Sequence, residues 1–299
     1  MNRGDGGAIE EPPVLWTRGK GCAELAALLS GPDPVRVQGD LEKECVRHRA
    51  ELFVSRRLPH TDLTSVAVPV DFEQDAVGSV VAAVAGGPHS PLAARVARRL
   101  GRTMGLHASM VCAHRDEEER AEAVSLIETL YVEVPGLEYR LIEADGPSAL
   151  VEQIPDHALL VLGAPGGNWF QRTLFGQGAR LRQAAPAGAV IVRQAPPRVF
   201  QHMGEPVFVG PLREATDILR IHREPVLAVV DRARLVGIVR REVLEIADPG
   251  VPVSELMEEP VWIPAEATVS EATEIAASFE GSVPVVDENG HVVGGFTAV

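Results

Sequence analysis

The feature that most constrains the fold is a regular alternation of short apolar segments with longer amphipathic segments between Val80 and Arg193. Short runs rich in Val, Leu and Ala predict strands, and segments with apolar residues every three or four positions predict helices. We expect strands at 80–85, 109–113, 138–143, 159–163 and 189–193, and helices at 90–105, 116–132, 148–154 and 178–184. Strands that alternate with helices form a parallel sheet with helices on both faces, so the predicted fold class is α/β.

The glycine-rich segment after the strand 159–163 is the main chemical signal. Gly163 and Gly166 are followed by nine residues and then by Gly176 and Gly178. Glycine allows the backbone to approach a ligand closely, and the N-terminus of the following helix offers free N–H groups to a phosphate. Parallel sheets bind ligands at the carboxyl ends of their strands. The segment therefore predicts an anion site, with a tight turn made only for packing as the alternative.

Two loops of this region are similar to those of a known family. The spacing Gly163-Ala-Pro-Gly166, nine residues, Gly176 resembles the ATP-binding loop of universal stress proteins, and Val84-Ala-Gly-Gly-Pro-His-Ser90 resembles their first loop. Over residues 78–195 the resemblance implies a five-stranded parallel sheet of the adenine-nucleotide α-hydrolase-like type, which commonly dimerises through its last strand. It also implies that adenosine lies near the first loop and phosphates on the glycine loop. The implied nucleotide-binding residues are Val84, Ala85, Gly86, Gly163, Ala164, Gly166, Gly167, Arg172, Gly176, Gln177, Gly178 and Ala179.

Two positions depart from the family pattern. Ala85 stands where the family has an acidic residue after the first strand, so one adenosine contact is missing. Gln177 stands where the family has Ser or Thr, although its amide can still donate to a phosphate. Arg172 and Arg180 would add positive charge near the loop.

The chain before residue 78 resembles a shortened copy of the same unit. Residues 1–13 are interpreted as a disordered lead-in, and 14–77 as a truncated α/β unit. In this interpretation the segments 35–40, 50–54 and 66–70 match 140–145, 157–161 and 189–193. Ser55-Arg-Arg-Leu-Pro59 replaces the glycine loop, so this copy is predicted to bind no nucleotide and to cover an edge strand. An unrelated α/β cap is the alternative.

A proline-rich join precedes an internal repeat of about fifty residues. Residues 196–206 are predicted to be a linker, followed by two units, 207–250 and 251–299. Each unit is predicted to contain a helix, a strand, a turn and a second strand, and Asn289-Gly290 is a strong hairpin turn signal. We expect helices at 212–222 and 269–279, and strands at 225–231, 235–239, 283–287 and 292–297.

The two repeats are similar to a pair of CBS (cystathionine-β-synthase-type) modules. The resemblance is carried by Val253-Ser-Glu-Leu-Met257, Glu266-Ala-Thr-Val-Ser-Glu-Ala272, and Val283-Pro-Val-Val-Asp287 followed by Gly294. It implies an α+β pair whose clefts often hold adenosine ligands, here with the cleft residues Gly237, Arg240, Pro284 and Thr297.

Several of the adenosine contacts of that family are missing. Arg240 replaces the Thr or Ser of the first module, and the sequence ends before the Asp that would follow Thr297. The first module also lacks the Met-containing opening. A dimerisation and interaction scaffold without ligand is therefore the alternative for this pair.

Charge and cysteine usage exclude several classes of function. The net charge is −14, and residues 243–299 contain 11 acidic residues and no Lys or Arg. Such a surface repels nucleic acid and anionic membranes, and the apolar runs are too short to span a bilayer. Three cysteines without a CxxC spacing predict free thiols in a reducing cytoplasm and no metal site; His107, Cys112 and His114 form the nearest cluster of metal-ligand types.

These observations lead to a cytoplasmic regulatory or stress-response protein without enzymatic activity. We expect it to sense an adenine nucleotide (ATP, AMP or cyclic di-AMP) and to form a homodimer through edge strands of the stress-protein domain or through the CBS pair. A scaffold that regulates an unknown partner enzyme or transporter without ligand is the alternative. A slow ATPase is a weaker third hypothesis, because no Walker loop, base or nucleophile is recognisable.

Overall fold

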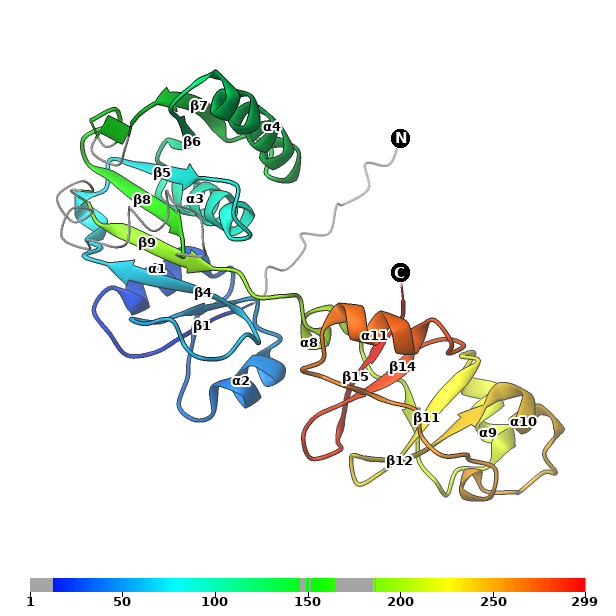
Figure 1. Ribbon diagram of the computed structural model, residues 1–299. Coiled ribbons are helices and arrows are strands. Elements are labelled where there is room, and N and C mark those ends of the chain that lie inside the picture. Colours follow the sequence, from blue (N-terminus) through cyan, green and yellow to red (C-terminus); the bar gives the residue numbers. More distant parts are fainter. Residues whose placement is uncertain (1–12, 146–148, 151, 165–184, 186, 299) are drawn as a thin grey trace, which may run out of the picture. The chain divides into compact units, whose positions relative to one another are not determined.

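The computed structural model describes residues 13–145, 149–150, 152–164, 185 and 187–298 (Figure 1). The chain divides between Ala195 and Pro196 into two compact units, and Cys45–Arg49 is grouped with the second unit. Among the helices in these described ranges, none combines the length and the apolarity needed to cross a bilayer.

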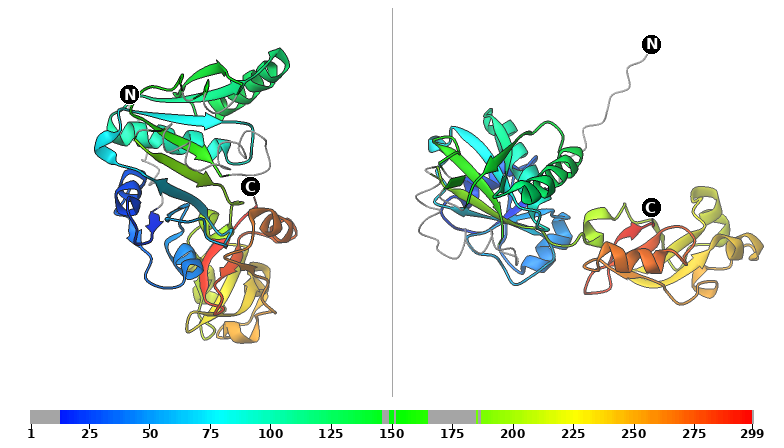
Figure 2. Two further views of the ribbon diagram at one scale, coloured as in Figure 1. Left: turned by 60° about the vertical axis from the view of Figure 1, so that its left-hand side comes forward. Right: turned by 45° about the horizontal axis from the view of Figure 1, so that its top comes forward.

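The described part of the first unit is built on a nine-stranded sheet with the order β2-β1-β3-β4-β9-β8-β5-β6-β7, which both further views show as one continuous layer (Figure 2). The strands are β1 Val14–Trp16, β2 Val35–Arg36, β3 Leu52–Val54, β4 Ser65–Val70, β5 Ser79–Val84, β6 Ala108–His114, β7 Glu138–Glu143, β8 Ala158–Gly163 and β9 Ala189–Arg193. All neighbours are parallel except β4 and β9, which are antiparallel. The expected five-stranded parallel sheet is therefore part of a larger mixed sheet.

Helices cover the sheet because its strands are apolar on both faces. The described helices of this unit are α1 Cys22–Leu29, α2 Leu41–His48, the 3-10 turn η1 Gln74–Ala76, α3 Ser90–Met104 and α4 Glu117–Glu133. Along β5, Val80, Ala82 and Val84 join one buried cluster, whereas Val81 and Ala83 join another. This alternation places a core on each side of the sheet, as expected for buried parallel strands.

The sheet consists of two similar halves that meet at β4 and β9. The N-terminal half-sheet (β1–β4) has the order β2-β1-β3-β4, and the C-terminal half-sheet (β5–β9) has the order β7-β6-β5-β8-β9. The antiparallel pairing is centred on Val68 and Ile191, so the first copy covers the edge of β9, as predicted. Because β9 pairs with β8 and β4, it offers no free edge for a homodimer, and a homodimer through another edge strand or through the CBS pair stays a prediction.

The expected match of 35–40 to 140–145 is also wrong. The strand β2 comprises only Val35–Arg36 and pairs with β1. It therefore corresponds to β6, which pairs in the same way with β5. β7, in contrast, pairs with β6. The N-terminal half-sheet therefore lacks an outer strand, rather than retaining a copy of β7.

The second unit contains two three-stranded sheets with the same topology, β10-β11-β12 and β13-β14-β15. Its elements are α8 Val199–His202, β10 Phe208–Val209, α9 Ala215–Ile221, β11 Val226–Asp231, β12 Arg234–Arg240, α10 Arg241–Ile246, η2 Val253–Glu255, β13 Ile263–Pro264, α11 Val269–Ala276, β14 Val283–Val286 and β15 Val292–Phe296. In each sheet a short parallel strand precedes an antiparallel hairpin with one register shift. The predicted internal repeat is confirmed.

The two modules exchange their opening segments. The backbone N–H of Val199 donates to the carbonyl of Ala267 (3.0 Å), and that of Val253 donates in the same way to Arg213 (2.9 Å). Each opening turn thus closes on the other module. Part of the predicted linker 196–206 is therefore a packed element, and Val199 and Phe200 are fully buried.

The methionines of these openings occupy equivalent positions. A Cβ atom built on Gly294 would lie 2.5 Å from Sδ of Met203, and one built on Gly237 would lie 2.8 Å from Sδ of Met257. Only glycine permits this approach of a methionine to each hairpin. The inference that the first module lacks a Met-containing opening is wrong, because Val199–Met203 supplies it.

Candidate functional site

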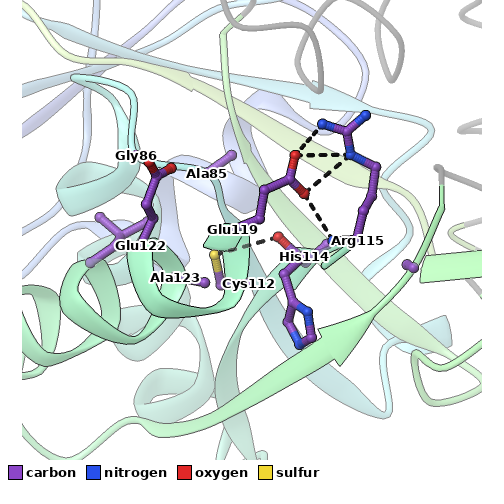
Figure 3. Close-up of a pocket in the computed structure, with 11 residues that line it drawn as sticks. Ala85, Gly86, Cys112, His114, Arg115, Glu119, Glu122 and Ala123 are labelled. Carbon is purple, nitrogen blue, oxygen red and sulfur yellow. Dashed lines mark hydrogen bonds and ion pairs between the residues drawn. The ribbon is translucent and has the colours of Figure 1, made fainter. Parts of the chain in front are cut away.

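A cavity of about 280 Å³ lies at the carboxyl ends of β5 and β6 (Figure 3). These strands are parallel neighbours, and Val84 is paired with Cys112, so the loops that follow them meet at one edge of the sheet. This is the usual place for ligands in such sheets. The cavity is lined by Ala85, Gly86, Cys112, Ala113, His114, Arg115, Glu119, Glu122, Ala123, Leu126 and Ala144.

The end of β6 contributes two buried polar side chains to this cavity. His114 is 8% exposed, and its Nδ1 atom has no hydrogen-bond partner in the described structure. Burial raises the pKa of the Cys112 thiol to about 11, so the thiol is protonated and not nucleophilic at neutral pH. Figure 3 shows the His114 ring turned away from Glu119 and Glu122, and its buried Nδ1 atom is not presented to the cavity.

An ion pair forms one side of the cavity. Nε of Arg115 donates to Oε1 of Glu119 (2.9 Å), and the backbone N–H of Arg115 donates to Oε2 (2.8 Å). The Arg115 side chain lowers the pKa of the Glu119 carboxyl, and the same hydrogen bond raises the pKa of Arg115. Figure 3 shows the two side chains turned toward each other. Asp116 caps α4 by accepting from the Glu119 N–H (2.9 Å), which fixes the helix start that carries Glu119 and Glu122.

Of the predicted nucleotide-binding residues, Ala85 and Gly86 line the cavity. Gly86 has a φ of 76°, a conformation that favours glycine. Val84 is buried in the core and does not line the cavity. Gly163 and Ala164 lie at the end of β8, where the Ala164 N–H donates to the Val192 carbonyl (2.7 Å).

The rest of the glycine loop is not described by the structure. Gly166, Gly167, Arg172, Gly176, Gln177, Gly178 and Ala179 lie outside the described residues, as does Arg180. The anion site stays a prediction.

The histidine and the charged residues of the cavity were not among the predicted nucleotide-binding residues. His114, Arg115, Glu119 and Glu122 come from the end of β6 and the start of α4. A signal for them existed, because the residues after two adjacent parallel strands gather at the same edge. His107, in contrast, precedes β6, and its Nε2 lies 3.1 Å from Oε2 of Glu138, so it is at the opposite end from His114. No cluster of metal-ligand types occurs among the described residues.

The predicted CBS cleft residues occupy separate positions. Arg240 ends β12, and its Nε donates to Oε1 of Glu258 (2.7 Å), so its charge is partly balanced within the chain. Met257 packs against Gly237, where an added Cβ atom would lie 2.8 Å from the Sδ atom of Met257. Pro284 is buried in β14, whereas Thr297 follows β15 and is exposed.

One family model matches part of the second unit. The family model described as "CBS domain" matches residues 253–298. The CBS domains of a transcriptional regulator from Streptococcus pneumoniae are 21% identical, with a TM-score of 0.28, and the match covers 30% of this chain and 82% of that chain. A CBS domain pair/ACT domain protein from Thermotoga maritima is 20% identical, with a TM-score of 0.31 and coverage of 33% of this chain and 88% of that chain.

A longer match involves the cytoplasmic domain of a prokaryotic cation chloride cotransporter. It is 8% identical, with a TM-score of 0.44, and covers 62% of this chain and 96% of that chain. No curated protein matches the chain. Residues 253–298 thus form a CBS domain within a CBS-like α+β region, whereas the universal stress protein resemblance of 78–195 stays a prediction.

Proposed function

We propose that the chain is a non-catalytic cytoplasmic regulatory protein that senses an adenine nucleotide through the cavity at the ends of β5 and β6. The observation that carries this proposal is a cavity of about 280 Å³ at the carboxyl ends of two parallel strands, lined by Ala85, Gly86 and the carboxylate of Glu122. Ligand sites commonly enclose about 300–1,000 Å³, so this cavity suits a purine base and part of a ribose.

The charges around the cavity favour the nucleoside end of the ligand. Glu119 and Glu122 line it, and Glu119 is already paired with Arg115. Carboxylates accept hydrogen bonds from ribose hydroxyls and repel phosphates. We therefore assign the base and ribose to this cavity and the phosphates to the predicted glycine loop after Gly163. Glu122 would then take the place of the acidic contact that Ala85 lacks.

The proposal includes no bond chemistry. The Cys112 thiol, with a pKa of about 11, is a poor nucleophile at neutral pH, and Arg115 and Glu119 are engaged with each other. The function would then be a ligand-dependent shift between conformations, which requires only different affinities for the two states. The CBS-like unit would transmit the shift or hold a dimer, since Arg240 and the exposed Thr297 make a poor adenosine cleft.

A scaffold without ligand is the second candidate. It is favoured by the contacts missing at Ala85 and Arg240, and it would regulate a partner enzyme or transporter through surface contacts alone. Pull-down from native lysate with and without nucleotide separates the two functions, because a scaffold binds its partner equally in both conditions.

The test is isothermal titration calorimetry of the full chain with ATP, AMP and cyclic di-AMP. We expect one of them to bind, and Glu122→Ala to weaken it about tenfold, the loss of one hydrogen bond from a ribose hydroxyl to a carboxylate. Glu118→Ala is the matched control, because it removes the same charge from an exposed position of α4 that does not line the cavity, and should leave the affinity unchanged. Absence of binding by all three nucleotides refutes the proposal, and nucleotide-dependent phosphate release above blank would favour the ATPase hypothesis instead.

A further inference from the structure

The loop between β5 and α3 reaches from the candidate cavity to the end of the first unit. Ala85 and Gly86, at the start of this loop, line the cavity at the ends of β5 and β6. His89, its last residue before α3, accepts a hydrogen bond on Nδ1 from the backbone N–H of Gln194 (3.1 Å). Gln194 follows β9, and the first unit ends one residue later, at Ala195. One short loop thus touches both the candidate ligand site and the segment through which the chain continues into the CBS-like unit.

Two consecutive amides at the end of the first unit are held by different halves of the sheet. Gln194 is held by α3 and its loop, because its Oε1 also accepts a hydrogen bond from Nη2 of Arg95 (3.3 Å). The next amide, that of Ala195, donates to Oγ of Ser65 at the start of β4 (3.4 Å). A change in the position of the loop should therefore disturb the Gln194 amide and leave the Ala195 amide in place.

The protonation state of His89 suits its role as an acceptor. Burial and the nearby charge of Arg193 lower the pKa of His89, so the imidazole is neutral at pH 7. The N–H of Gln194 points at Nδ1, so the ring proton lies on Nε2. The contact is therefore one neutral hydrogen bond between the loop and the end of β9.

This hydrogen bond can be made or broken by a small difference in ligand affinity. One neutral hydrogen bond shifts an equilibrium by about tenfold. A ligand in contact with Ala85 or Gly86 needs only to bind one position of the loop about tenfold more tightly than another to change whether the bond forms. The loop contains Gly86 at a φ of 76°, a conformation that other residues rarely adopt.

We propose that His89 is a positioning residue that couples the cavity at the ends of β5 and β6 to the end of the first unit. Ligand contact at the start of the loop changes the position of the loop, and His89 passes this change to Gln194. The ligand part of this inference rests on the proposed nucleotide function, whereas the link between the loop and Gln194 does not. Because coupling is reciprocal, loss of the His89 contact should change the ligand affinity, although His89 does not line the cavity.

The link is tested without ligand by hydrogen exchange of the full chain, resolved to the amides of Gln194 and Ala195. Gly86→Ala strains the loop, and we expect the Gln194 amide to exchange about fivefold faster while the Ala195 amide is unchanged. Gly21→Ala is the matched control, with a φ of 73° in the corresponding loop of the N-terminal half. An added Cβ atom lies 3.4 Å or more from its neighbours at both positions, so both variants act through backbone strain. An unchanged Gln194 amide in Gly86→Ala, or the same increase in Gly21→Ala, would overturn the link.

The ligand part is tested by calorimetric titration with ATP, AMP and cyclic di-AMP. His89→Ala should change the dissociation constant several-fold, and His89→Asn should restore it, because the Asn Oδ1 atom can accept from Gln194 near the position of Nδ1. A nucleotide that binds all three proteins equally would refute the coupling and leave the proposed function standing. If none of the three nucleotides binds, the proposed function and the ligand part both fail, and exchange in Gly86→Ala still decides the link.

Discussion

The two halves of the nine-stranded sheet share an arrangement and differ in what their loops can hold. In each half, the first strand in the sequence lies beside the second. The last strands of the two halves, β4 and β9, pair with each other. The N-terminal half has strands of two or three residues before β4, whereas β5 and β8 each have six. Residues 55–59 follow β3 where the glycine-rich segment follows β8. The N-terminal half thus has the strand that pairs the two halves without the glycine spacing that predicts an anion site.

The largest expected effect comes from breaking the join between the halves. Val68 is 6% exposed and pairs with Ile191 at the centre of the β4–β9 contact. Val68→Asp buries an unpaired carboxylate and should cost more than about 4 kcal/mol in the free energy of unfolding. Val132→Asp, at a side chain that is 81% exposed, should change it by about 0.5 kcal/mol or less.

Hydrogen exchange then decides whether the halves are one cooperative unit. In Val68→Asp, we expect amides of β3 and of β8 to lose protection together. Loss confined to β3 would contradict a single cooperative sheet, and would mean that the C-terminal half is stable without its neighbour.

The CBS-like unit offers a second pair of repeats, joined by exchanged segments instead of a strand edge. Phe200 is fully buried, and its backbone N–H donates to the Ala265 carbonyl of the other module (2.9 Å). Phe200→Ala should cost about 3–5 kcal/mol in this unit, measured by thermal unfolding. Phe208→Ala, at a side chain that is 49% exposed, serves as the control. Equal effects of the two substitutions would be inconsistent with segment exchange as a source of stability.

A pair of matched glycines tests whether only one half binds nucleotide. Gly21 and Gly86 both lie between the first strand and the first helix of a half-sheet, with φ values of 73° and 76°. Substitution of either by alanine should cost about 1 kcal/mol from backbone strain. Only Gly86→Ala adds a methyl group to the candidate cavity, so only it should weaken nucleotide binding, by several-fold in calorimetry. If Gly21→Ala weakened nucleotide binding instead, the ligand would lie in the N-terminal half.

The smallest effect concerns pH. Burial and the nearby charge of Arg193 lower the pKa of His89 from 6.5. A histidine with a lowered pKa is neutral in the folded state, so its contribution is present above pH 6.5 and is lost as the pH falls below that value. Glu271, whose pKa is lowered from 4.5 by hydrogen bonds from Thr268, contributes above pH 4.5 and loses its effect only below it.

Acidification from pH 7 to 5 should therefore weaken the first unit before the second. Unfolding followed by hydrogen exchange at several pH values measures this, and His89→Asn should reduce the slope in the first unit. An unchanged slope in that variant would assign the effect to another group.

The sequence predicted the regular elements well where the periodicity was long. The strands 138–143 and 189–193 and the helix starting at Ser90 agree with β7, β9 and α3. β1 was missed because its three residues Val14–Trp16 are too short to show a period, and they form a strand only by pairing with β2 and β3.

Long-range contacts explain the remaining errors. The opening at Val199–Met203 carries no local signal, because its hydrogen bonds reach residues more than sixty positions away, at Ala265 and Ala267. The contact of His89 with Gln194 joins residues 105 positions apart, so nothing in the local sequence indicates it. Ala85 and Gly86 were found from their loop, whereas His114 required knowledge of which strand lies beside β5.

The antiparallel contact of β4 with β9 also has a consequence for concentration. Two separate subunits would hold such a contact by mass action and would part on dilution. Here residues 71–78 tether β4 to β5, and a short tether gives an effective concentration in the millimolar range. The pairing of β4 with β9 should therefore persist at any protein concentration in a cell. Because each half always meets the other half of its own chain, the two sequences can change independently while this pairing is kept.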